Sequence, residues 1–169
     1  MVGEVREPTT SRRNREPGRV VRIPLGDGSA GFGRQLNGVL VGFYDYFAPD
    51  SEYPDLLRLV ANDFAFRVPV MDYAFKRTGQ WDLLDVVPLS VDEASEIYRA
   101  FKQDPISGKL SIYWSGPAKG AWGEDDATRT ECDGLERAAV WDPEHVEDRL
   151  RDHREGRPNK WVESLRLRD

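Results

Sequence analysis

Three short apolar stretches, separated by two tight-turn signals, occupy the segment after the polar N-terminal residues. The stretches are Arg19–Leu25, Ala30–Leu36 and Val39–Tyr46. Gly26-Asp27-Gly28 separates the first two and Asn37-Gly38 the last two, and such residues favour hairpin turns because they tolerate positive φ. Stretches of this length, rich in β-branched and aromatic residues, are typical of strands. The segment therefore predicts an antiparallel meander of three strands.

Further strands and loops are expected downstream. Phe64–Val70 alternates apolar and polar positions, the period of a half-buried strand, and Pro69 favours a place at a sheet edge. Other segments have the composition of strands or of a loop. We expect strands at Trp81–Leu89 and Leu135–Trp141, a hairpin from Ile97–Lys102 and Leu110–Trp114, and a loop at Gly116–Thr130.

The clearest helix signal comes near the C-terminus. Asp142-Pro143-Glu144 combines an N-cap residue, a proline suited to the first helical position and an acid at the positive end of the helix dipole. Gly156 and Pro158 end this helix. The chain is thus predicted to be a β-rich α+β protein: a twisted antiparallel sheet or small open barrel with the C-terminal helix packed outside. We expect residues 1–18 to form a flexible leader and residues 19–169 a single domain.

Composition excludes several classes of protein. One cysteine, Cys132, cannot form an internal disulfide, and two histidines are too few for a histidine-rich metal centre. No stretch approaches the roughly 18 apolar residues of a membrane span. Residues 1–19 have no apolar core, so we expect no secretory signal. The single cysteine fits a reducing compartment, and we expect no cofactor.

Catalytic motifs are missing from the sequence. Gly31 and Gly33 are not followed by a third glycine in register or by a helix, so they predict a bulge or close packing rather than a phosphate loop. His145 and His153 lie eight residues apart on the expected helix, roughly 12 Å at 1.5 Å per residue, too far to share one metal ion without other ligands. Cys132 has no histidine nearby in sequence and favours a buried, inert thiol. The sequence therefore favours a binding protein over an enzyme.

Acidic residues gather in the C-terminal part. Residues 123–155 contain twelve aspartates and glutamates against five arginines, a net charge of -7 within a chain of net charge -6. Such a field repels nucleic acid and attracts a basic partner, although the same residues also suit a purely solvating face. Trp122 lies beside two glycines in the acidic loop and is the tryptophan expected to be exposed, as an interface anchor. The predicted partner-binding residues are Trp122, Glu124, Asp125, Asp126, Glu144, Glu147 and Asp148.

The first hairpin resembles the opening of a known family. Ile23-Pro24-Leu25, the turn at Asp27-Gly28 and Gly31-Phe32-Gly33-Arg34 are similar to the start of the immunity protein 26 family of bacterial polymorphic toxin systems. Later signals follow in the same order, so that the resemblance covers about residues 19–115. The later signals are Phe43-Tyr44-Asp45, the strand Phe64–Val70, Gly79-Gln80-Trp81 leading to Pro88-Leu89, and Phe101-Lys102-Gln103-Asp104-Pro105.

The resemblance implies a cytoplasmic immunity protein that binds and neutralises a cognate toxin. Many toxins of such systems are nucleases with basic substrate grooves, which acidic groups on an inhibitor would complement. Members of the group are also labelled phosphotriesterase, so a small hydrolase is one alternative function, although the resemblance brings no catalytic residues. A regulatory barrel that binds a small ligand is the other alternative, and a deep apolar pocket would favour it.

Overall fold

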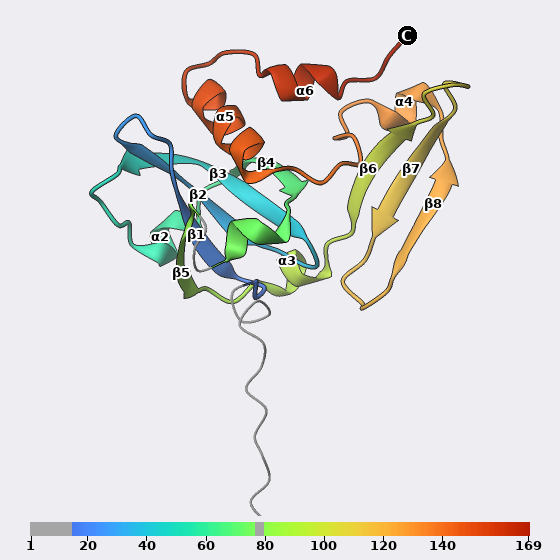
Figure 1. Cartoon of the computed structure of the whole chain (residues 1–169). Helices are drawn as coiled ribbons and strands as arrows, with labels where there is room; N and C mark the ends of the chain where they lie inside the picture. Colours follow the sequence, from blue (N-terminus) through green and yellow to red (C-terminus); the bar gives the residue numbers. More distant parts are fainter. Residues whose placement is uncertain (1–14, 77–79) are drawn as a thin grey trace, which may run out of the picture.

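The computed structural model describes residues 15–76 and 80–169, which form two antiparallel sheets with short helices around them (Figure 1). The larger sheet has the strand order β4-β3-β2-β1-β5 and the smaller one β6-β7-β8. The strands are β1 (Arg19–Pro24), β2 (Ser29–Gln35), β3 (Leu40–Pro49), β4 (Phe64–Pro69), β5 (Asp82–Val86), β6 (Tyr98–Gln103), β7 (Leu110–Ser115) and β8 (Trp122–Asp126). The helices are α2 (Leu56–Leu59), the 3-10 helix η1 (Asp72–Phe75), α3 (Val91–Ser95), α4 (Arg129–Cys132), α5 (Pro143–Arg154) and α6 (Lys160–Ser164).

The predicted meander is the centre of the larger sheet. Strands β1, β2 and β3 pair in sequence order, and the turn residues Gly28 and Gly38 have φ of 85° and 61°, in the region that favours glycine. The register between β2 and β3 shifts between Gly31 and Gly33, as expected for a bulge. A Cβ on Gly33 would lie 3.0 Å from Cδ1 of Phe43, so this glycine is required by close packing.

Both faces of the larger sheet are buried. On one face, Phe43 and Phe66 pack beneath α5 together with Leu150. On the other, Phe32 and Tyr44 pack against Leu59 of α2 and its neighbours. Because neither face is open to water, all seven residues of β2 are buried and the strand shows no alternation of polar and apolar residues.

Helix α5 lies across the larger sheet (Figure 1). Val146 and Leu150 point inward and are fully buried. Leu150 fills the space above Gly31, where a Cβ would lie 3.1 Å from its Cδ1. The Arg151 side chain donates a hydrogen bond of 2.6 Å to the Leu25 carbonyl oxygen. The helix is therefore fixed to the sheet by apolar packing at its centre and by this hydrogen bond near its C-terminal end.

The segment between α4 and α5 joins the two sheets. Phe101 of β6 donates to the Glu136 carbonyl and accepts from the Ala138 amide, and Trp141 donates to the Pro69 carbonyl of β4. The expectation of a strand at Leu135–Trp141 is wrong, because this segment makes isolated bridges to two different sheets instead of a continuous ladder. The expectation of a loop over all of Gly116–Thr130 is also wrong, since Trp122–Asp126 forms β8. The pairing of β8 with β7 overrides its weak strand propensity.

The predicted leader falls largely outside the described residues, which begin at Arg15. Its last four residues pack on the domain. Arg15 donates a hydrogen bond of 2.7 Å to the Val70 carbonyl, and the Gly18 amide donates to the Gln35 carbonyl at the same distance. Residues 15–18 thus belong structurally to the body that follows them.

The predicted fold class is confirmed. The protein is β-rich, its strands pair in antiparallel fashion, and the C-terminal helix packs on the outside of a sheet. Of the two predicted arrangements, the open sheet is found: neither sheet closes into a barrel over the described residues. Strand β4, with Pro69, lies at the predicted edge position.

Candidate functional site

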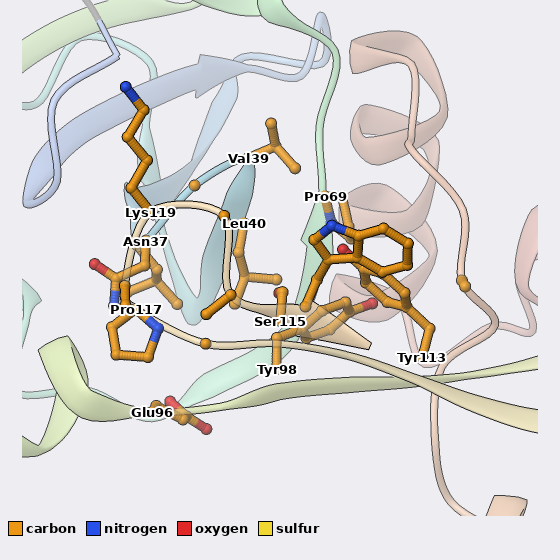
Figure 2. A pocket seen from close by; sticks show the side chains of 18 of the residues that line it. Asn37, Val39, Leu40, Pro69, Glu96, Tyr98, Tyr113, Ser115, Pro117 and Lys119 are labelled. Carbon is orange, nitrogen blue, oxygen red and sulfur yellow. The ribbon is translucent and has the colours of Figure 1, made fainter. Parts of the chain in front are cut away.

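A cleft of about 780 Å³ lies between the two sheets (Figure 2). One wall is the tight turn between β2 and β3, residues 36–40. The opposite wall is formed by Tyr98, Tyr113 and Trp122 of the smaller sheet, and the linking segment 138–140 completes the lining. Most of these side chains are apolar, so the cleft suits apolar groups of a partner or ligand.

The strand register explains why three aromatic residues share this wall. Ser115 of β7 pairs with Tyr98 of β6 and with Trp122 of β8, while Tyr113 lies two residues before Ser115. Because side chains alternate along a strand, Tyr98, Tyr113 and Trp122 point to the same face of the smaller sheet. The centroids of the Tyr113 and Trp122 rings are 6.3 Å apart.

Trp122 is the most exposed of the five tryptophans, with 63% of its surface accessible, as the sequence predicted. Because Trp122 both lines the cleft and is exposed, it lies at the mouth of the cleft. An indole held by a strand and exposed beside an apolar hollow has the properties of an interface anchor.

Tyr98 and Lys102 add polar groups to the same wall. Burial and the nearby Glu136 raise the pKa of Tyr98, so its hydroxyl stays protonated at neutral pH. The Lys102 ammonium lies 5.5 Å from the Tyr113 ring centroid and 2.7 Å from a carboxylate oxygen of Glu124. Neither group has the arrangement of a general base beside a nucleophile.

The carboxylates of β8 extend the site beyond the cleft. Glu124 accepts hydrogen bonds from Lys102 and from the Ser111 hydroxyl, which lower its pKa. Asp126 lies 2.8 Å from the Lys109 ammonium. Asp125 is exposed and forms no ion pair with any residue in 15–76 or 80–169. Lysines therefore offset two of the three charges on this strand.

The predicted residues on α5 lie apart from β8. Glu144 accepts a hydrogen bond of 2.8 Å from the Tyr73 hydroxyl, and Asp148 accepts from Arg151 and from the Trp161 indole. Glu147 is only 7% exposed and accepts a hydrogen bond from the Trp81 indole, and burial raises its pKa. The structure therefore divides the predicted surface into two groups and places Glu147 in the interior.

Sequence reasoning missed most of the cleft lining. The lining comes from a turn, a strand end and a linker, which converge only through the packing of the two sheets. These segments are residues 36–40, Pro69 and residues 138–140. The one signal available in the sequence was Trp122, because a tryptophan in a glycine- and acid-rich segment has few neighbours to cover it.

The residues tested against catalytic templates have structural surroundings. His145 stacks on Trp161 with a centroid distance of 3.6 Å, and His153 lies 2.9 Å from Asp45. Cys132 is fully buried, and burial raises the pKa of its thiol. Over residues 15–76 and 80–169, no group of three or more histidine, cysteine or acidic side chains is arranged to hold a metal ion. In the same residues, no helix is long and apolar enough to cross a membrane.

Comparison with known proteins gives one family match. The model of a family described as Immunity protein 26 matches residues 16–110, more than half of the chain. The match begins just before β1 and ends at the start of β7, so it includes the whole larger sheet and the β2–β3 turn of the cleft. No curated protein and no solved structure matches the chain significantly.

Proposed function

The chain belongs to the immunity protein 26 family, and from this premise we propose that it neutralises a cognate toxin by binding it at the cleft and at strand β8. The observation that supports this site above all is the exposed Trp122 at the mouth of the apolar cleft. A large aromatic anchor beside a hollow provides the desolvated centre that a tight protein interface needs. The proposal also places the protein in the cytoplasm with a basic toxin, such as a nuclease.

The charges of β8 support a role in association rate more than in affinity. Lys102 and Lys109 offset Glu124 and Asp126, which leaves Asp125 as the acid of the strand that no described residue pairs with. Exposed charges at an interface rim mainly accelerate encounter with a partner of opposite charge. The proposed site thus combines an apolar centre with a modestly acidic rim.

Binding to the toxin encoded beside this chain's gene tests the proposal. Truncating a central anchor commonly costs about 2 kcal/mol or more, so Trp122→Ala should weaken binding about 30-fold. Ile106→Ala is the matched control, because Ile106 is 95% exposed in the β6–β7 turn and lies outside the cleft lining. Equal affinities of both variants and the wild-type protein would place the toxin contact elsewhere. A neighbouring gene product that is neither toxic nor bound would contradict the immunity function.

Charge reversal separates the rim from the anchor. Glu124→Lys combined with Asp125→Lys should slow association with a basic toxin and reduce its dependence on salt, with little change in dissociation rate. Stopped-flow measurements at several salt concentrations give both rates. An unchanged association rate would make these carboxylates a solvating face only.

The size of the cleft also favours a second candidate, the binding of a small apolar ligand. Ligand pockets commonly measure about 300–1,000 Å³, and this cleft falls within that range. Native mass spectrometry of the purified protein tests this candidate. A stoichiometric bound molecule that Trp122→Ala releases would support ligand binding, and a spectrum of the unliganded mass alone would argue against it.

A further inference from the structure

We propose that the toxin adds a basic β-strand to the outer edge of β8, so that backbone hydrogen bonds form part of the interface. This inference rests on the proposed function and specifies how the partner binds. Strand β8 is the terminal strand of the smaller sheet and pairs with β7 alone among the strands described. An edge strand presents unpaired amide and carbonyl groups that can bind an extended segment of a partner.

The ladder between β7 and β8 shows which backbone groups face outward. Just beyond the two ends of the ladder, the Gly116 amide donates to the Ala121 carbonyl at 2.8 Å, and the Ala127 amide donates to the Leu110 carbonyl at 3.0 Å. Hydrogen-bonded pairs alternate along an antiparallel ladder. Residues 121, 123, 125 and 127 therefore direct their backbone groups toward β7. The amides and carbonyls of Trp122, Glu124 and Asp126 point away from it.

These outward groups have no partner among the described residues. Over residues 15–76 and 80–169, the outward amides and carbonyls of Trp122, Glu124 and Asp126 form no backbone hydrogen bond. All three residues are exposed, and the Glu124 carboxylate accepts hydrogen bonds from Lys102 and Ser111. The edge can therefore accept a strand without first breaking a backbone hydrogen bond.

The same three residues connect the edge to the cleft. Their side chains share the face that carries Tyr98 and Tyr113, because Trp122 pairs with Ser115 and Glu124 with Tyr113. A strand added to this edge would place every second side chain on that face. An apolar residue opposite Trp122 would lie at the cleft mouth, and basic residues would lie opposite Glu124 and Asp126.

Charge selects the occupant. A second copy of this chain paired edge to edge would bring Glu124, Asp125 and Asp126 of both copies together, and like charges on neighbouring strands are destabilising. A strand with lysine or arginine at alternate positions meets the opposite charge at Glu124 and Asp126, whose side chains share one face of the smaller sheet. The structure thus favours a basic strand from a partner over self-association.

A proline substitution tests the role of the backbone. Glu124→Pro removes an outward amide, and proline is tolerated on the free side of an edge strand. Glu124→Ala removes the same carboxylate and keeps the amide, so it is the matched control. We expect Glu124→Pro to bind the toxin at least tenfold more weakly than Glu124→Ala. Equal affinities of the two variants, both folded, would overturn the inference and leave the proposed function intact.

Amide hydrogen exchange of the wild-type protein gives an independent measurement, which also decides the matter should Glu124→Pro fail to fold. The probes are the toxin and a seven-residue peptide in which lysine alternates with valine, with a glutamate–valine peptide as control. We expect the toxin and the lysine peptide to protect the amides of Trp122, Glu124 and Asp126. Absence of protection by both would overturn the inference. Dimers in sedimentation experiments that Glu124→Pro abolishes would assign the edge to a second copy and refute the choice of a basic partner strand.

Discussion

The packing of α5 on Gly31 allows a quantitative test through a double-mutant cycle. Leu150→Ala removes three buried carbons, each worth about 0.8 kcal/mol on transfer, and leaves a cavity above β2. We expect a loss of about 3–4 kcal/mol in the free energy of unfolding, within the range observed for buried leucines.

Gly31→Ala has different effects on stability in the two backgrounds. In the wild-type protein the new Cβ lies 3.1 Å from Cδ1 of Leu150, and this crowding offsets the roughly 0.5–1 kcal/mol that alanine gains over glycine in a strand. In Leu150→Ala the crowding is absent and the methyl group fills part of the cavity. There we expect Gly31→Ala to stabilise the protein by about 1–2 kcal/mol.

Urea unfolding at neutral pH measures the cycle on the wild-type protein, the two single variants and the double variant. Equal m-values are required for a valid comparison. The expected coupling between the two sites is about 1–2 kcal/mol, above the roughly 0.5 kcal/mol scatter of independent substitutions. Additive effects within that scatter would show that α5 moves on the sheet instead of pressing against Gly31, and would refute the reasoning.

Three further predictions concern buried groups. Gly33→Val should destabilise the fold by about 1–3 kcal/mol in urea unfolding, because even a Cβ would lie 3.0 Å from Phe43; unchanged stability would contradict the packing role. Burial raises the pKa of Glu147 in the folded state, so its contribution to stability falls as pH rises above the ordinary carboxyl pKa. Glu147→Gln, which keeps an acceptor for the Trp81 indole, should therefore raise the melting temperature at pH 7 and lose this advantage near pH 4; a gain that is equal at both pH values would refute the argument. The Cys132 thiol is buried with a raised pKa, so a thiol reagent should modify it only as fast as the protein opens. Rapid modification under native conditions would show that α4 opens readily.

Local sequence signals determined much of the fold. The turn residues Asn37-Gly38 and Gly26-Asp27-Gly28 specify hairpins because they act over two or three residues, and the strands around them formed as predicted. The same holds for α5, where Asp142 and Pro143 mark the helix start and Val146 and Leu150 set its buried face. The exposure of Trp122 was also predictable, since its neighbours in sequence offer little to cover it.

Strand formation at positions without a local signal depended on tertiary pairing. Trp122–Asp126 contains a glycine and three acids, yet it forms β8 because β7 supplies a ladder and Lys102 and Lys109 supply counter-charges. Leu135–Trp141 has strand composition, yet it forms no continuous ladder. Its two bridge partners, Phe101 and Val70, lie at different sheets.

The site itself was decided only by the tertiary structure. The cleft exists because segment 136–141 holds the two sheets side by side, a relation between residues far apart in sequence that no local pattern encodes. Burial of Glu147 likewise follows from Trp81, 66 residues away, whose indole donates to it. In sequence, Glu147 was one acid among twelve in residues 123–155, and charge alone could not separate an interior carboxylate from those on the surface.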